Sequence, residues 1–365
     1  MTQRLSVNGL PTPVPWTPVL LSRELRRTQR RRVSVQGRRF AIFRTGSGGV
    51  GALPDQCPHR RAPLSEGRVS GEHLVCPYHG WRFATDGAVT RAGAPSETHC
   101  TSVLRCREAD GLIWIADSLG AAEPPSLAMP GTVPIGTLRM SIASPLALVL
   151  DNLTEMEHCA EAHLLFGYDA AGLAQVTVSV TSSETSVRVV ARGPQRRLPA
   201  PARWMWRCLG GAADDMFVDE MVVEYAPVRI ASESYWESAA TGERRRDAVR
   251  AQVVLTPVSA GVTDLFAIYA LAHGCTPVAR WARPLLWRII RLELERDRRV
   301  AAMVAAADPS LTGMELSRFD APVQEVRRKL AVVDVRTDYG AGPPGLASVS
   351  AGPARETNSL TPTGA

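Results

Sequence analysis

The segments Cys57-Pro58-His59 and Cys76-Pro77-Tyr78-His79-Gly80-Trp81, separated by sixteen residues, decide the fold of the first part of this chain. Each segment offers one thiol and one imidazole, so the two together present four side chains of the kinds that bind metals. Short runs of alternating residues surround both segments, which is typical of strands joined by tight turns. The pattern therefore predicts a small β domain that holds a metal group between two loops.

The mixed ligand set favours a particular group. Two thiolates can hold one iron of a [2Fe–2S] cluster while two neutral imidazoles hold the other, which raises its reduction potential. Pro58, Pro77 and Gly80 restrict or free the backbone where the loops close, and Trp81 can shield the group from water. A mononuclear zinc site is the alternative, because zinc also accepts Cys and His.

Outward from these loops, polar and apolar residues alternate from Arg32 to Arg44. Gln36-Gly37 interrupts the alternation, which predicts a β-hairpin. Further short β runs lie at Leu74-Val75, Trp81 to Phe83 and Leu112 to Ile115. The segment from Ala121 to Pro125 ends this character, so we predict a domain boundary after residue 122.

The second part of the chain reads as a helix followed by a mostly antiparallel sheet and a second helix. Apolar residues have helical spacing from Ser144 to Phe166 and again from Ala282 to Ala307, where Pro309 stops the helix. Strand patterns lie at Gln175 to Val180, Ser186 to Val190, Met216 to Val228, Ser234 to Glu237, Ala248 to Thr256 and Thr263 to Leu271. From residue 334 the Gly, Pro, Ser and Thr content predicts disorder.

Composition excludes several classes of protein. The 365 residues are 45% hydrophobic and carry a net charge of +6, too apolar for general disorder and too weakly basic for purely electrostatic nucleic-acid binding. No apolar run approaches a membrane span and no signal peptide opens the chain, so we expect a cytoplasmic protein. Seven cysteines without a secretion signal argue against a disulfide framework. Those outside the two loops, Cys159 included, are expected to be buried free thiols, and Cys159 is expected to point away from His158.

A second cluster of possible ligands lies in the segment from Asp151 to His163. His158 and His163 are five positions apart, about 140° around an ideal helix, so a bend is needed to aim both at one metal. Two histidines and one carboxylate form the ligand set of an oxygen-activating non-haem Fe(II) centre. The alternative is a solvated helix face that happens to carry histidines.

The segments CPHRRAPLSEGR and CPYHGWRF resemble the Rieske cluster signature, and with the histidine pair the chain resembles the Rieske non-haem iron oxygenases. The resemblance implies that Cys57 and Cys76 bind one iron of the cluster while His59 and His79 bind the other. It implies an α+β fold, with an all-β Rieske domain followed by a helix-grip catalytic domain. We place an N-terminal arm at 1–13, the Rieske domain at 14–122, the catalytic domain at 123–333 and a tail at 334–365.

The resemblance also implies that His158 and His163 bind a mononuclear iron. Glu155, three positions before His158, then takes the place of an acidic bridge that accepts a hydrogen bond from His79 of the partner subunit in a homotrimer. The family usually has aspartate there, and Asp151 is the rival for the role. Asn152 is expected close to the iron.

The third iron ligand should be a carboxylate of the helix predicted from Ala282 to Ala307. Glu293, Glu295 and Asp297 are the choices, and we expect Asp297 because its context resembles the family's and small residues follow it. The alternative is an exposed helix with ion pairs between neighbouring turns.

The implied activity is that of a terminal oxygenase, which uses O2 and electrons from a ferredoxin or reductase. No dinucleotide-binding motif occurs, so NAD(P)H would act only through that partner. The cluster segment most resembles pheophorbide a oxygenase-like enzymes and prodiginine cyclase-like enzymes, which favours hydroxylation or cyclisation of a hydrophobic multi-ring secondary metabolite. The alternatives are an O-demethylase of a methoxy-aromatic acid, with an arginine in its pocket, and a non-catalytic Rieske electron carrier.

Two further features each allow two interpretations. Trp204-Met205-Trp206 could line the pocket or belong to the core. The basic stretch from Arg23 to Arg39 could be a solvated strand edge or a ferredoxin-docking face.

Overall fold

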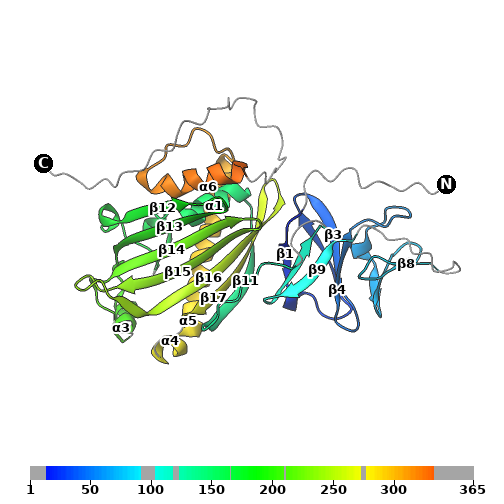
Figure 1. Ribbon diagram of the computed structural model, residues 1–365, viewed down its shortest axis with the longest axis horizontal. Helices are drawn as coiled ribbons and strands as arrows, with labels where there is room; N and C mark the ends of the chain where they lie inside the picture. The colour runs from blue at the N-terminus through cyan, green and yellow to red at the C-terminus, as the bar shows by residue number, and fades with distance from the viewer. Residues whose placement is uncertain are drawn as a thin grey trace.

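The computed structural model describes residues 14–91, 103–117, 123–164, 166–208, 211–272 and 277–332. The strands divide into two groups that lie side by side (Figure 1). The first ten strands form three small antiparallel sheets, and the next seven form one large antiparallel sheet. The predicted α+β fold with an all-β N-terminal domain is confirmed. The predicted boundary at 122, the arm at 1–13 and the tail at 334–365 fall outside the described residues and stay predictions.

The N-terminal domain consists of short strands in the sheet orders β1-β10-β9, β2-β3-β4 and β5-β6-β7-β8. Its strands are β1 (Thr17–Leu21), β2 (Arg30–Val35), β3 (Arg38–Arg44), β4 (Val50–Pro54), β5 (Arg68–Ser70), β6 (His73–Val75), β7 (Arg82–Phe83), β8 (Val89–Thr90), β9 (Arg105–Ala109) and β10 (Leu112–Ala116). The predicted hairpin is β2-β3, and Gln36 and Gly37 both adopt positive φ, at 50° and 73°. Two successive left-handed residues suit the twist of a two-residue hairpin.

The C-terminal domain is a seven-stranded sheet in the order β11-β17-β16-β15-β14-β13-β12. Its strands are β11 (Val133–Ile142), β12 (Thr177–Ser182), β13 (Ser186–Pro194), β14 (Met216–Tyr225), β15 (Val228–Glu237), β16 (Arg244–Ser259) and β17 (Val262–Leu271). The predicted strand over 216–228 ends earlier, because Ala226-Pro227 forms the turn between β14 and β15. A proline is suited to this turn since it cannot donate a ladder hydrogen bond.

Helices cover one face of this sheet. They are α1 (Leu146–Thr154), α2 (Cys159–Ala162), α3 (Ala200–Cys208), α4 (Pro277–Trp281), α5 (Arg283–Ala307) and α6 (Ala321–Val332). The long gold helix α5 passes behind the sheet, with α1 and α6 at its upper edge (Figure 1). The buried side chains of the sheet, α1, α5 and α6 form one core. The predicted helix over 282–307 is α5, whereas α6 was not predicted.

The two domains share a small core of their own. Trp16, Leu21 and Trp114 of the first domain pack with Val254 and Phe266 of the large sheet. The turn of the β2-β3 hairpin also donates two backbone hydrogen bonds, at 2.7 and 2.9 Å, to the carbonyls of residues 257 and 258 at the end of β16. Apolar contacts and hydrogen bonds together make this a packed interface.

Candidate metal centres

The two loops that carry the Cys and His pairs have the same backbone pattern. In the first, the Cys57 N–H donates to the carbonyl of Ala62 and its carbonyl accepts from Arg61, both at 2.8 Å. In the second, Cys76 donates to Trp81 at 2.8 Å and accepts from Gly80 at 3.2 Å. The fifth residue of each loop has positive φ, 59° at Arg61 and 69° at Gly80. Each loop therefore closes on itself through local hydrogen bonds.

The loops place their thiols inside and their imidazoles outside. Cys57 and Cys76 are buried, while His59 and His79 are exposed with ring centroids 4.5 Å apart. Trp81 stacks on His59 at 4.8 Å, as expected of a side chain that shields the site. Two inner sulfurs and two outer nitrogens at one tip of the domain fit a cluster with Cys on the inner iron and His on the outer one.

The protonation chemistry of Cys57 and His59 also fits a bound metal. Burial raises the pKa of Cys57 to about 11, so this thiol ionises at neutral pH only when a cation stabilises its thiolate. Partial desolvation and the charge of the neighbouring His79 lower the pKa of His59, which favours the neutral imidazole that binds metals. The pair therefore has the protonation states that metal binding requires, or reaches them when the metal binds.

The second candidate centre lies at the non-helical segment between α1 and α2. The sequence predicts one helix from Ser144 to Phe166, but α1 ends at Thr154 and Glu155 is extended, with φ −94° and ψ 149°. His158 is the residue before α2 and His163 the residue after it. This break is the bend that two histidines five positions apart need in order to face one point.

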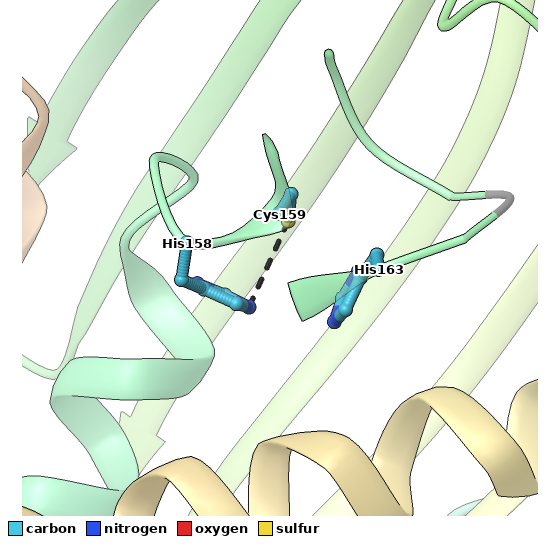
Figure 2. Close-up of side chains that lie close together, drawn as sticks. All are labelled: His158, Cys159 and His163. Atoms are coloured by element: carbon cyan, nitrogen blue, oxygen red, sulfur yellow. Dashed lines mark hydrogen bonds between the residues drawn. The ribbon is translucent and has the colours of Figure 1, made fainter. Parts of the chain in front are cut away.

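Asp297 of α5 completes a three-residue group with these histidines. Its Oδ1 lies 2.8 Å from His163 Nε2 and 3.4 Å from His158 Nε2. Figure 2 shows the two imidazoles directed toward the space above the gold helix α5. All three side chains are at least partly buried. Two imidazole nitrogens and a carboxylate oxygen thus meet at one point, as in a facial triad.

Glu155 orients the first histidine of this group. Its Oε1 lies 2.6 Å from His158 Nδ1, and its Oε2 accepts backbone N–H bonds from Glu157 at 2.6 Å and His158 at 3.1 Å. A carboxylate on Nδ1 fixes the tautomer and leaves Nε2 free to bind a metal. The rival, Asp151, forms an ion pair with Arg327 of α6 instead.

The other two carboxylates of α5 have different partners. Glu295 is ion-paired with Arg298 at 2.6 Å and Arg299 at 3.1 Å, on the outer face of the helix. Glu293 is buried and accepts the Leu164 N–H at 2.9 Å. Only Asp297 of the three reaches the histidines.

Two arginines hold the backbone around His163. Arg196 donates to the carbonyls of Cys159 at 2.5 Å, Ala160 at 3.0 Å and Tyr168 at 2.7 Å, and also to that of His163. Arg296 donates to the carbonyl of Ala162 at 2.7 Å. Sequence reasoning missed Arg196, because nothing in the pattern distinguishes it from the many exposed arginines. It is a buried cation whose donors satisfy the carbonyls at the end of α2.

The three side chains favour one another electrostatically. Burial opposes charge at Asp297, but the hydrogen bonds of His158 and His163 outweigh it and lower the pKa of this carboxyl group. Burial also opposes charge at His163, but Asp297 and Cys159 outweigh it and raise the pKa of His163 to about 10. These surroundings favour a positive charge, which a bound metal ion would supply in place of the imidazole proton.

Cys159 corrects one prediction. It is a buried free thiol, as expected, but it does not point away from the histidines. Its Sγ lies 3.7 Å from His158 Nε2 (Figure 2), and the donor atoms of His158, Cys159 and His163 lie within 4.8 Å of one another. The short helix α2 turns the side chain toward the centre, whereas a continuous helix would have placed it elsewhere.

A cavity of about 150 Å³ opens beside these residues. Asn152, the two histidines and Asp297 line it together with residues of β14, β15, β16, β17 and α5. Trp206 belongs to the core and Trp204 is exposed, and neither lines the cavity. The sequence did not predict Asp219 or Tyr269 on its wall, because strand patterns do not reveal which face of a sheet borders a cavity.

Comparison with known proteins identifies the first centre. Residues 15–105 match the Rieske [2Fe-2S] domain family. The first domain is therefore a Rieske domain, the kind of domain that holds a [2Fe–2S] cluster. No helix within the described ranges is long and apolar enough to span a membrane.

The relatives place the chain more closely. It is 33% identical over 156 residues to chlorophyllide a oxygenase of Chlamydomonas reinhardtii, covering 40% of this chain and 24% of that protein. It is 31% identical over 157 residues to 4beta-methylsterol monooxygenase of Methylococcus capsulatus, covering 39% of this chain and 42% of that protein. The chain thus matches less than half the length of these relatives. Dicamba monooxygenase bound to 3,6-dichlorosalicylic acid has a similar structure, with a TM-score of 0.72 at 20% identity, covering 88% of this chain and 96% of that one.

These comparisons show a Rieske domain in the chain and similarity to two oxygenases over less than half of their length. The match to the family model is confined to residues 15–105, while the similarity in structure to dicamba monooxygenase covers 88% of the chain.

Proposed function

We propose that this protein is the terminal oxygenase component of a Rieske non-haem iron system. The observation that carries the proposal is the meeting of His158, His163 and Asp297 at one cavity, in a chain that also contains a Rieske domain. A facial triad is the ligand set of oxygen-activating non-haem Fe(II) centres, and a Rieske cluster can supply such a centre with electrons.

In this proposal Cys57, His59, Cys76 and His79 hold the cluster, and His158, His163 and Asp297 hold a mononuclear Fe(II). When bound, the cluster relays electrons and the iron activates O2 beside the substrate. The chain's own part is to orient the ligands: Glu155 fixes the tautomer of His158, and Arg196 and Arg296 fix the backbone that carries His163. Asn152 lines the cavity near them, in reach of a bound substrate.

The electrons would come from a separate ferredoxin or reductase, since the chain has no nucleotide-binding motif and NAD(P)H can contribute only through such a partner. We further propose a cytoplasmic homotrimer in which Glu155 accepts a hydrogen bond from His79 of the partner subunit. His79 is exposed and Glu155 is only partly buried, which supports this role. The basic stretch from Arg23 to Arg39 is available for docking an acidic ferredoxin.

We propose a hydrophobic substrate with ring systems, hydroxylated or cyclised in secondary metabolism by a pheophorbide a oxygenase-like or prodiginine cyclase-like enzyme. The cavity wall is mainly apolar, and the two curated relatives named above act on a chlorophyllide and a methylsterol. A volume of about 150 Å³ suits one aromatic ring, so only the reacting part of a larger substrate would enter.

The second candidate is demethylation of a methoxy-aromatic acid, favoured by the structural similarity to dicamba monooxygenase, whose crystals hold an aromatic acid. Such a substrate calls for a cation to grip its carboxylate. Within the part of the chain that the structure describes, no arginine or lysine lines the cavity. This favours the first candidate. A non-catalytic electron carrier would have no use for the second centre.

Iron analysis, spectroscopy and O2 consumption of the full-length protein test the proposal. With a donor system and substrate, the wild-type protein should consume O2 and contain iron beyond the two atoms of the cluster. The Asp297→Ala variant should keep the cluster spectrum, lose the additional iron and lose at least ~100-fold in activity, because removing a ligand costs more than removing its supporting partners. Full activity in that variant would contradict the proposed ligand set. Iron only in the cluster of wild-type protein would support the electron carrier.

A further inference from the structure

One carboxylate in the cavity has no place in the metal centre. Asp219 of β14 faces Ser234 of β15 across the strand pair, and Ser234 Oγ donates to its Oδ1 at 2.8 Å. Both residues line the cavity, on the sheet side, opposite α5. Alternation along β14 places Asp219 on the same face as the cavity residues Phe217 and Met221, and Glu220 on the other face.

The Asp219 carboxylate has fewer partners than its surroundings demand. Among the described residues, Ser234 gives it its only hydrogen bond, and no arginine, lysine or histidine forms an ion pair with it. A carboxylate has about four sites for donors. Burial raises the pKa of Asp219, and the Ser234 hydrogen bond and the more distant charge of His163 oppose that effect. An enclosed carboxylate of this kind is stabilised by any donor that a ligand brings.

The rest of the wall gives this carboxylate its selectivity. Its neighbours on the sheet side include the apolar residues Met221, Ile230, Val249 and Val253. The described wall has no lysine or arginine. A ligand with a ring and one donor group would satisfy both the apolar wall and Asp219. A ligand with its own carboxylate would meet a like charge at Asp219, and the described wall has no arginine or lysine to pair with that carboxylate.

We propose that Asp219, held by Ser234, is a specificity-determining residue that binds a hydrogen-bond donor on the substrate ring, an N–H, O–H or ammonium group, and excludes carboxylate-bearing substrates. This inference rests on the proposed function, because it assigns the substrate class of the same cavity. It separates the two candidate reactions, since an aromatic acid is the class that Asp219 disfavours.

The test is calorimetric binding of four small probes to the full-length protein with both iron centres loaded. Aniline offers a neutral donor, benzylammonium a cation, toluene a ring of similar size without a donor, and benzoate an anion. Aniline should bind about tenfold more tightly than toluene, because a hydrogen bond to a charged group contributes about that much. Benzoate should bind at least about tenfold more weakly than aniline.

Two variants of Asp219 separate acceptor from charge. Asp219→Leu, of similar shape, should bring aniline and toluene within about twofold of each other. The wild-type protein should also bind benzylammonium more tightly than toluene, because the carboxylate attracts the cation. Asp219→Asn keeps an acceptor without the charge, so it should retain part of the aniline preference, lose the benzylammonium preference and bind benzoate more tightly than the wild-type protein does. Glu220→Gln is the matched control, because Glu220 is the next residue of β14 and pairs with Arg188 at 2.8 Å on the outer face. It should bind all four probes as the wild-type protein does.

Ser234→Ala is a milder variant, in case Asp219→Leu does not fold. It should reduce the preference for aniline about threefold, because the carboxylate loses the hydrogen bond that holds it in place. Equal binding of aniline and toluene to the wild-type protein, or a tenfold preference that survives in Asp219→Leu, would overturn the inference. Binding is measured without turnover. A protein that shows these preferences but consumes no O2 would therefore contradict the proposed function and leave this inference intact.

Discussion

The loops at Cys57 and Cys76 close on themselves, whereas the segment from His158 to His163 is held by residues from distant parts of the chain. Each loop is closed by two backbone hydrogen bonds between residues four or five positions apart. The second segment depends on Arg196, Glu293, Arg296 and Asp297. A local loop is built wherever its short sequence occurs. A centre with distant supports exists only when the whole domain has folded, so the two centres should respond differently to substitution.

The largest expected effect comes from removing a ligand of the cluster. Cys76→Ala should abolish the visible absorption of the cluster, because one iron loses half of its thiolate ligands. The iron at His158, His163 and Asp297 should remain bound, since its supports lie in the other domain. Metal analysis combined with visible and electron paramagnetic resonance spectra measures both. Loss of iron from both sites would show that the centres depend on each other.

The next effect concerns the distant supports. Arg196→Met removes the donors from four carbonyls around α2 and should lower the affinity for Fe(II) about 10-fold, while the cluster spectrum stays unchanged. Arg197→Met is the control, because Arg197 is the next residue and its side chain is exposed. Titration of the iron-free second site with Fe(II) gives both affinities. Equal affinities of Arg196→Met and the wild-type protein would remove Arg196 from the support of the centre.

A smaller effect compares the two loops with each other. Gly80 and Arg61 occupy the same loop position with positive φ, but only glycine adopts that conformation without strain. Gly80→Ala should therefore lower the free energy of unfolding by about 1 kcal/mol, since no atom lies within 4 Å of the added Cβ and only the backbone is strained. Arg61→Gly should raise it by a similar or smaller amount. Denaturant unfolding of the two variants checks the opposite signs.

The smallest effect lies on α5, away from the centre. The hydrogen bond and charge of Arg298, with Arg299, lower the pKa of Glu295 to about 2. Because the folded-state value lies below that of the unfolded chain, the stabilisation is complete above about pH 4.5 and is lost as the pH falls toward 2. Glu295→Gln should cost about 0.5 kcal/mol at pH 7, since these charges are solvent-exposed, and almost nothing near pH 2. Activity should not change, in contrast to Asp297→Ala two positions further on.

The sequence predicted what is encoded locally. The β2-β3 hairpin, most of the strands, helix α5 and the Rieske domain followed from short patterns, while the cluster ligands Cys57, His59, Cys76 and His79 stay a prediction. The proximity of Asp297 to His158 and His163 also agrees with the expectation, although spacing alone did not select it from the three carboxylates of α5.

The rest depended on tertiary structure. The break after Thr154 has no glycine or proline to announce it, and Glu155 stabilises the turn through backbone N–H bonds that a pattern does not reveal. The orientation of Cys159 follows from that break. The burial of Arg196 and the position of Asp219 on the cavity side of the sheet are set by how β13 and β14 pack, so they could not be inferred from residue types.

The shared core between the domains has a consequence for how the protein unfolds. Trp16, Leu21 and Trp114 are buried against Val254 and Phe266, so separating the domains would expose a contiguous apolar patch to water. The two domains should therefore melt in a single cooperative transition rather than one after the other. A Rieske domain cut from the rest of the chain would carry this patch on its surface and tend to aggregate, even with its cluster intact.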